Sequence, residues 1–322
     1  MSASFRKIDY SLRPAKYAER KMLVEVLRRL AAYQPVEDYS YVGFGSVWFS
    51  DFTLFHRALG IRDMVSIEKA ENARDRIEAN KPFQIRVEYA SSSTALPRID
   101  WAKRTIVWLD YDEPLLPSML QDVRIVATRC MSGSLVAVSV QCVKAPEYIA
   151  YEREAGLDEQ AIGAIERFEQ AFGRDRVPPG TSDDDLVAWS YGKLIRKMIK
   201  AEVESALGSR NAGEVNILEF LPICEIEYQD DARMTTLVGL IVDQEDKQRY
   251  SVCGFDRLDF MSGNNSPIRI EMPKLTVREL RLIEQQLPSN GEDLILGAIP
   301  SSDALKFARM YRYFPNFAVM EA

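Results

Sequence analysis

The chain has 322 residues, 47% of them hydrophobic and 28% charged, with a formal net charge of −7 at neutral pH. This composition excludes collagen-like and low-complexity classes, and the acidic balance argues against a surface built for nonspecific nucleic-acid binding. No apolar run reaches the roughly 20 residues of a membrane helix, and no apolar signal core follows the first residues, so we expect a cytoplasmic protein without a membrane partner.

The chain opens with a basic segment. Residues 1–29 hold eight Lys or Arg against three Asp or Glu, a net charge of +5, so the rest of the chain carries −12. Apolar residues recur every three or four positions over 15–33 and predict an amphipathic helix, with Pro14 suited to its start. The basic residues could contact a phosphate or an acidic neighbour, or they could form a solvated helix face.

Arg13 and Lys16 flank Pro14 at the start of this helix. From there they could hold a carboxylate or phosphate of a substrate or cofactor. Pairing with Glu19 at the surface is the simpler alternative.

Short apolar runs and helical patterns then alternate along the chain. Strands are predicted at 39–45, 63–68, 83–90, 104–111 and 134–141, and helices at 50–59 and 71–81. Such alternation is typical of a parallel sheet with helices on both faces. Two further strands at 215–228 and 234–243 predict an antiparallel hairpin added to this sheet. We therefore expect a Rossmann-like α/β fold with a mostly parallel sheet and an antiparallel terminal hairpin.

These patterns divide the chain into three parts. We expect an N-terminal basic helix over 1–34, an α/β domain over 35–245 and a C-terminal α+β cap over 246–322. A charged helical stretch over 149–208 is expected as an insertion in the α/β domain. The insertion and the cap would form the wall of the substrate site, because variable segments at the carboxyl edge of a sheet set specificity.

The first predicted strand ends in a glycine turn, Gly43-Phe44-Gly45-Ser46. Glycines let backbone approach a ligand closely there, and the following helix N-terminus favours an anionic group. Glu68 ends the second strand, 25 residues after Gly43, near the roughly 20-residue spacing at which an acid meets ribose hydroxyls. Glu68 could instead pair with Lys69 or solvent. Together the two features favour a nucleoside-containing ligand.

The glycine turn lacks the marks of two common nucleotide sites. A dinucleotide fingerprint would place a third glycine at position 48, where this chain has Trp48, so NAD and FAD are disfavoured. No GK[ST] sequence follows the glycines, so a phosphate-binding P-loop is not indicated. The four cysteines form no CxxC pair and His56 is the single histidine, so the sequence predicts no metal site.

From residue 35 to 245 the arrangement resembles a class I S-adenosylmethionine-dependent methyltransferase. The resemblance rests on the turn VGFGS (42–46), Glu68, a polar turn at 89–92, the LDYD turn (109–112) and the terminal hairpin. It departs from the family at Tyr41, because the family usually has an acid two residues before the first glycine. More narrowly, the chain is similar to uncharacterised bacterial proteins grouped as O-methyltransferases.

The resemblance implies S-adenosylmethionine as the cofactor. Its methionine part would be bordered by Gly43, Gly45 and Ser46. Its ribose would meet Glu68, and its adenine would meet Ser91 with its neighbours.

Asp110, Tyr111 and Asp112 are the candidate catalytic residues. Ligands of open α/β sheets lie outside the carboxyl ends of the strands, so these side chains would face the methyl donor. A partly desolvated carboxylate has a raised pKa and can remove a proton from the acceptor. Alternatively, the two aspartates cap the next helix or bind loop amides. A divalent metal at this turn would need a third ligand, which the spacing does not show.

Three functions remain open on these grounds. The first is methyl transfer to an oxygen or nitrogen acceptor, a small molecule or a nucleic acid. The second is a methyltransferase-like fold without catalysis that binds a protein partner, which Tyr41 favours. The third is nucleic-acid modification. It is favoured by the basic segment and by the aromatic stretch at 311–317, whereas a pI of about 5.1 argues against it.

Overall fold

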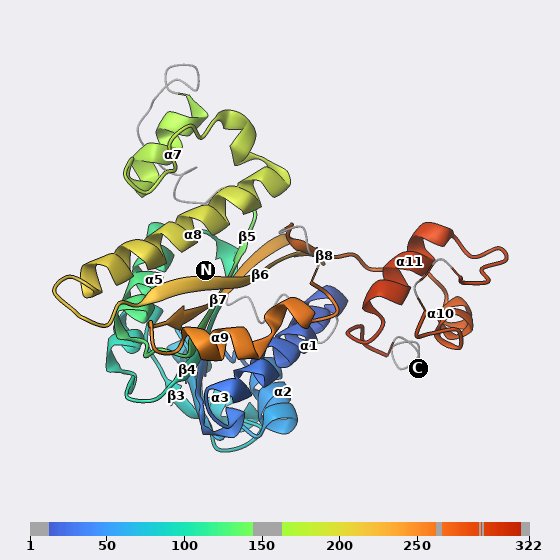
Figure 1. The fold of residues 1–322 in the computed structure, drawn as a ribbon, viewed down its shortest axis with the longest axis horizontal. Helices are drawn as coiled ribbons and strands as arrows, with labels where there is room; N and C mark the ends of the chain where they lie inside the picture. The colour runs from blue at the N-terminus through green and yellow to red at the C-terminus, as the bar shows by residue number, and fades with distance from the viewer. Residues whose placement is uncertain (1–12, 144–162, 262–265, 290, 292, 317–322) are drawn as a thin grey trace.

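The computed structural model describes residues 13–143, 163–261, 266–289, 291 and 293–316. Within these residues one eight-stranded sheet lies between two layers of helices (Figure 1). The strand order is β3-β2-β1-β4-β5-β7-β6-β8. The strands are β1 (Ser40–Gly43), β2 (Asp63–Ile67), β3 (Arg86–Glu88), β4 (Thr105–Pro114), β5 (Ser134–Gln141), β6 (Glu219–Gln229), β7 (Arg233–Val242) and β8 (Ile268–Ile270).

The first five strands pair in parallel, and β7 runs antiparallel between β5 and β6. At the centre of the sheet Val42 lies beside Val65 on one side and Val107 on the other, and all three are buried. Such runs are apolar on both faces because helices cover both faces of a parallel sheet. The fold is the Rossmann-like α/β arrangement expected from the sequence, with its antiparallel hairpin.

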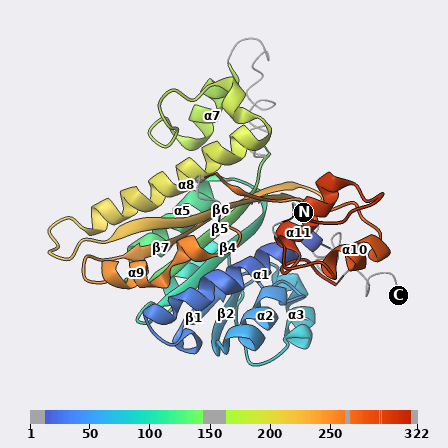
Figure 2. The same cartoon turned by 45° about the vertical axis from the view of Figure 1, so that its right-hand side comes forward.

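The helices form two layers, with the sheet between them in Figure 2. One layer contains α1 (Pro14–Arg29), α2 (Ser50–Leu59), α3 (Arg74–Asn80) and α9 (Lys247–Cys253). The other contains α4 (Ser92–Ala95), α5 (Pro117–Arg129), α7 (Ala164–Phe172) and α8 (Ala188–Arg210). Short 3-10 turns join them: η3 (Leu30–Ala32), η4 (Val36–Asp38), η5 (Glu71–Ala73), η6 (Leu96–Arg98), η7 (Asp183–Leu186) and η8 (Phe255–Arg257).

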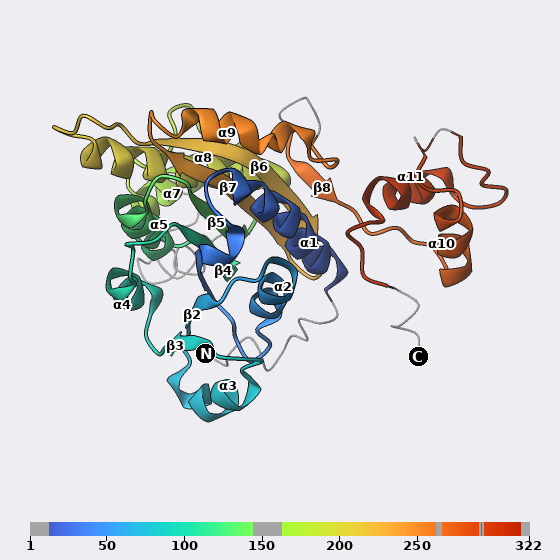
Figure 3. The ribbon, with the colours of Figure 1, turned by 60° about the horizontal axis from the view of Figure 1, so that its bottom comes forward.

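The last two helices extend beyond the β8 edge of the sheet. These are α10 (Val277–Glu284) and α11 (Ser301–Met310), which Figure 3 shows set apart from the main body. Thr276 and Glu279 form the capping box that begins α10. Arg312 and Tyr313 both bind Asp259, and so tie the end of the chain to the loop after η8.

Most elements agree with the sequence patterns. The predicted helix at 50–59 and strand at 134–141 coincide with α2 and β5, and β4 continues through Pro114 beyond its predicted end. The predicted insertion contains α7, η7 and α8, while its residues 149–162 lie outside the described residues. None of the helices that the structure describes has the length and apolar character required to cross a membrane.

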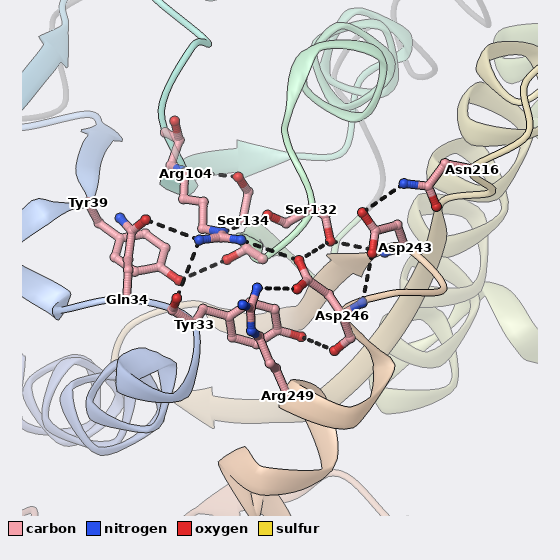
Figure 4. A network of polar contacts seen from close by, with 12 residues as sticks. Tyr33, Gln34, Tyr39, Arg104, Ser132, Ser134, Asn216, Asp243, Asp246 and Arg249 are labelled. Atoms are coloured by element: carbon pink, nitrogen blue, oxygen red, sulfur yellow. Dashed lines mark hydrogen bonds and ion pairs between the residues drawn. The ribbon is translucent and has the colours of Figure 1, made fainter.

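A polar network closes the amino-terminal edge of the sheet (Figure 4). Arg104, just before β4, donates to the Ser132 carbonyl at 2.9 Å and to the Asp246 carboxylate at 3.3 Å. Asp246 also accepts from the Ser132 hydroxyl at 2.8 Å. Burial opposes ionisation of Asp246, but hydrogen bonds from Ser132 and Arg249 and the charge of Arg104 lower its pKa. Surface hollows at this edge lie beside these structural groups, at the opposite ends of the strands from the glycine turn.

Candidate functional site

The carboxyl ends of three neighbouring strands carry most of the residues predicted for the site. Gly43 ends β1, Glu68 follows β2 and Asp110 lies in the last part of β4. These strands are adjacent in the sheet, and helix α1, in the layer on one face of the sheet, directs Lys16 to Asp110. This edge is where ligands of open α/β sheets bind.

Glu68 holds the glycine turn in place. Its Oε1 accepts a 2.7 Å hydrogen bond from the Ser46 amide and another from the Ser66 hydroxyl at 2.7 Å. The Gly45 amide donates to the same Ser66 hydroxyl at 2.9 Å. Ser46 has a φ of 55°, a left-handed conformation that is costly for a residue with a side chain. The bond to Glu68 stabilises this turn.

Glu68 is a buried acid, only 7% exposed. Burial raises its pKa, hydrogen bonds from Ser66 and Ser46 oppose that rise, and the charge of Asp51 adds to it. A hydroxyl donor or a nearby cation would favour the ionised form of this carboxylate.

The two glycines are required by the protein's own side chains. A Cβ on Gly43 would lie 2.6 Å from the Tyr41 hydroxyl, and one on Gly45 would lie 2.8 Å from the Ser66 hydroxyl and 2.6 Å from Cε1 of Phe49. All three distances are shorter than real Cβ contacts. The sequence argument from close ligand approach therefore missed an internal packing requirement.

Tyr41 points along β1 toward the glycine turn, and its hydroxyl donates to the carboxylate of Asp51 in the first turn of α2. Burial raises the pKa of Asp51, and the charge of Arg20 opposes the rise. A carboxylate therefore lies beside the first glycine although position 41 has none. Sequence reasoning missed Asp51, whose only signal was an acid in the first turn of a predicted helix.

Lys16 is 2% exposed and lies at the centre of a charge cluster under α1. Its ammonium pairs with Asp110 and, at 2.8 Å, with Glu19, and it lies 4.4 Å from the ring centroid of Trp108. The expected pairing with Glu19 is present, but it is buried rather than at the surface. The alternative of a solvated helix face is wrong for Lys16.

Further hydrogen bonds connect this cluster to the sheet. Glu19 accepts from the Thr236 hydroxyl on β7, which lies 2.7 Å from the Ser139 hydroxyl on β5. The Trp108 indole donates to Ser139 at 2.9 Å. The polar face of α1 thus contacts three strands through paired groups.

A residue far along the chain, Asp230, fixes the start of α1. Arg13 occupies the N-cap position, and the amides of Ala15 and Lys16 each donate at 3.1 Å to the carboxylate of Asp230, in the turn between β6 and β7. A carboxylate at a helix N-terminus satisfies amides that have no partner within the helix.

Tyr111 and Asp112 have other contacts than Asp110. The Tyr111 hydroxyl donates to Asp122 of α5 at 2.7 Å, on the other face of the sheet, and the Asp112 carbonyl accepts from the Gln141 amide. The structure therefore places the Tyr111 side chain away from Asp110. Neither aspartate caps the next helix, because the N-cap of α5 is Leu116.

The turn after β3 reaches the Tyr111 side of the site. Ser91 occupies the N-cap position of α4, and its hydroxyl contacts those of Ser93 at 3.0 Å and Thr94 at 2.9 Å. Ser92 donates to Asp122, the carboxylate that also binds Tyr111. The predicted adenine contact and Tyr111 are thus linked through one α5 residue.

The structure also places Trp48 and His56, two other residues considered in the sequence analysis. Trp48 is 39% exposed, so its indole does not separate helix from strand. The Nδ1 of His56 lies 2.7 Å from the Ile61 carbonyl, and its ring packs 4.2 Å from that of Phe83. Among the residues that the structure describes, no three His, Cys, Asp or Glu side chains gather as a metal site would need.

The family model described as "Putative O-methyltransferase" matches residues 8–322. The chain belongs to this family. A comparison with curated proteins finds no match.

Solved structures of methyltransferases are similar at low identity. An rRNA methylase from Streptococcus thermophilus is 10% identical, with 70% of this chain and 94% of that chain covered and a TM-score of 0.34. The plantazolicin methyltransferase BamL, in complex with a triazolic desmethylPZN analog and S-adenosylhomocysteine, is 9% identical, with 69% of this chain and 85% of that chain covered and a TM-score of 0.34. Such values carry no information about the substrate of this O-methyltransferase family member.

Proposed function

We propose that this chain transfers a methyl group from S-adenosylmethionine to an oxygen acceptor at the carboxyl edge of β1, β2 and β4. The observation that carries the proposal is the joint placement of two groups: a glycine turn braced by buried Glu68, and Asp110 held by Lys16. When bound, the cofactor would supply an electrophilic methyl group. The family match supports the same reaction.

The residues at the glycine turn fit this cofactor. The Ser46 hydroxyl is buried without a hydrogen-bond partner among the described residues, so it has a bond to offer a ligand. In this proposal Ser46, Gly43 and Gly45 border the methionine part. Glu68 binds the ribose hydroxyls, and Ser91 lies at the adenine end.

Asp110 is the proposed base. An oxygen acceptor must lose a proton as it attacks the methyl group, and a carboxylate within reach can take that proton. Lys16 binds Oδ1 of Asp110, which orients the carboxylate, and the side chain keeps 22% of its surface exposed at the edge. Tyr111, on the opposite face, and Asp112 would then shape the turn rather than take the proton.

The test is transfer of labelled methyl groups. Purified protein is incubated with S-adenosylmethionine labelled in the methyl group and, separately, with the metabolite, nucleic-acid and protein fractions of a bacterial lysate. We expect label in the metabolite fraction. Binding of S-adenosylhomocysteine without transfer to any fraction would favour a binding module, and absence of binding would show the cofactor assignment to be wrong.

Label in the nucleic-acid fraction would instead support nucleic-acid modification. The structure gives that function less support than the sequence did, because Lys16 and Arg20 are 2% and 7% exposed. Two of the basic residues that a nucleic acid would contact are therefore buried against the sheet.

A further inference from the structure

Arg20 is a buried cation with an unused donor. It lies one turn after Lys16 on α1, is 7% exposed, and its Nε has no hydrogen-bond partner among the described residues. None of the ion pairs between described residues includes it, whereas Lys16 has two carboxylate partners. Leaving such a group buried and unpaired is costly, so its unused donor suits an anion bound from outside the chain.

Arg20 lies one helical turn from Lys16, which binds Asp110, and its charge reaches residues beside the glycine turn. Its charge acts on Asp51, on Tyr41 and on Tyr228, whose hydroxyl is also buried without a partner in the described part of the chain. The Tyr41 hydroxyl, which would lie 2.6 Å from a Cβ on Gly43, donates to Asp51. Asp51 therefore lies beside the first glycine, and the charge of Arg20 acts on it from α1, although no ion pair between described residues joins the two.

This arrangement is complementary to an amino-acid zwitterion. A guanidinium binds a carboxylate through parallel N–H donors, and a carboxylate accepts from an ammonium. We propose that Arg20 binds the α-carboxylate, and Asp51 the α-ammonium, of the methionine part of S-adenosylmethionine. The inference rests on the proposed function. It assigns the contacts with the amino-acid end to α1 and α2, because position 41 holds a tyrosine instead of an acid.

The experiment compares two ligands that differ only by the amino-acid end. Calorimetric titrations use S-adenosylhomocysteine and 5′-methylthioadenosine, which keeps the adenosyl thioether but has no zwitterion. The variants are Arg20→Gln and Asp51→Asn, the second of which can still accept from Tyr41. Arg28→Gln is the matched control, because Arg28 lies on the same helix with 54% of its side chain exposed.

We expect each variant to lose at least tenfold in affinity for S-adenosylhomocysteine while its affinity for 5′-methylthioadenosine stays within about twofold; tenfold corresponds to about 1.4 kcal/mol. The Arg28 variant should bind both ligands as the wild type does. Equal losses for both ligands would overturn the inference, since a structural defect weakens both. Unchanged affinity for S-adenosylhomocysteine would overturn it as well.

Failure of the proposed function gives a different result. In that case the wild-type protein binds neither ligand, before any variant is compared. Melting temperatures measured beside the titrations identify a variant that has lost its fold.

Discussion

Asp110 and Tyr111 are consecutive in the chain but lie on opposite faces of the sheet. Successive strand residues point to opposite sides, so Asp110 meets Lys16 under α1 while Tyr111 meets Asp122 on α5. The two side chains therefore contact different helices although one sequence motif contains both. This relationship separates the proposed base from the residues that support its turn.

Replacing Asp110 by Asn is expected to lower methyl transfer about 100- to 1,000-fold, because the base is lost while shape and hydrogen bonding are kept. Affinity for S-adenosylhomocysteine should stay within a few-fold. The comparison variant is Asp112→Asn, for which we expect a smaller loss of turnover. Rates are measured with labelled cofactor and the accepting fraction. An equal loss in both variants would contradict the assignment of the base to Asp110.

Replacing Lys16 by Met is expected to destabilise the protein by about 3–5 kcal/mol, because the change leaves the buried Glu19 and the partly exposed Asp110 without their cation. Glu19→Gln added to Lys16→Met should restore part of this loss, since one of the two carboxylate charges is then removed. Urea denaturation of the three proteins measures the free energy of unfolding. A double variant as unstable as, or less stable than, Lys16→Met would show that charge is not the cause.

An alanine at Gly45 should lower stability by about 1–3 kcal/mol, because its Cβ would overlap the Phe49 ring and the Ser66 hydroxyl. The same change should weaken cofactor binding, since Ser66 also binds Glu68. Combining Gly45→Ala with Phe49→Leu should recover some stability by freeing space. Thermal melts and calorimetry report the two effects. Wild-type stability in Gly45→Ala would mean that the turn has room to move.

The buried carboxyl group of Asp122 is expected to make the stability of the protein depend on pH. It is 1% exposed, and burial raises its pKa above 3.8 despite hydrogen bonds from Ser92 and Tyr111. The folded chain therefore holds this proton more tightly than the unfolded chain. Its contribution to stability is complete below the unfolded pKa and is lost as pH rises through the folded value.

The wild type should accordingly lose stability relative to Asp122→Asn as pH rises from about 4, the ordinary pKa of an aspartate, toward neutral pH. Unfolding free energies of both proteins, measured across that range, give the difference directly. A difference that does not change with pH, or one that grows in favour of the wild type, would contradict the raised pKa.

The fold was predictable where local pattern and tertiary surroundings agree. Residues 134–141 are mainly apolar because β5 is buried in the middle of the sheet, and that pattern identifies a strand without further context. Helix α5 was not predicted, although its buried residues recur at helical spacing. Strand β8 has three residues and exists only because it pairs with β6, so no local signal marks it.

The site was predictable to a lesser extent. Glu68 and the glycine turn are separated by a spacing that reflects one strand–helix–strand unit, so sequence alone brings them together. The partner of Lys16 was not predictable, because Asp110 is 94 residues away and meets it only through the packing of α1 on the sheet. Arg20 and Asp51 likewise depend on how two helices pack against β1.

The bond between Asp230 and the first turn of α1 spans 215 residues. During synthesis, α1 leaves the ribosome long before the β6–β7 turn exists, so its first amides lack this acceptor while most of the sheet is being made. Closing a loop of that length has an entropic cost that must be met before the contact stabilises the chain. The edge where we propose that the cofactor binds is therefore expected to be completed late in folding. A fragment that ends before β6 would contain every sequence motif of the site without Asp230, which fixes the start of α1.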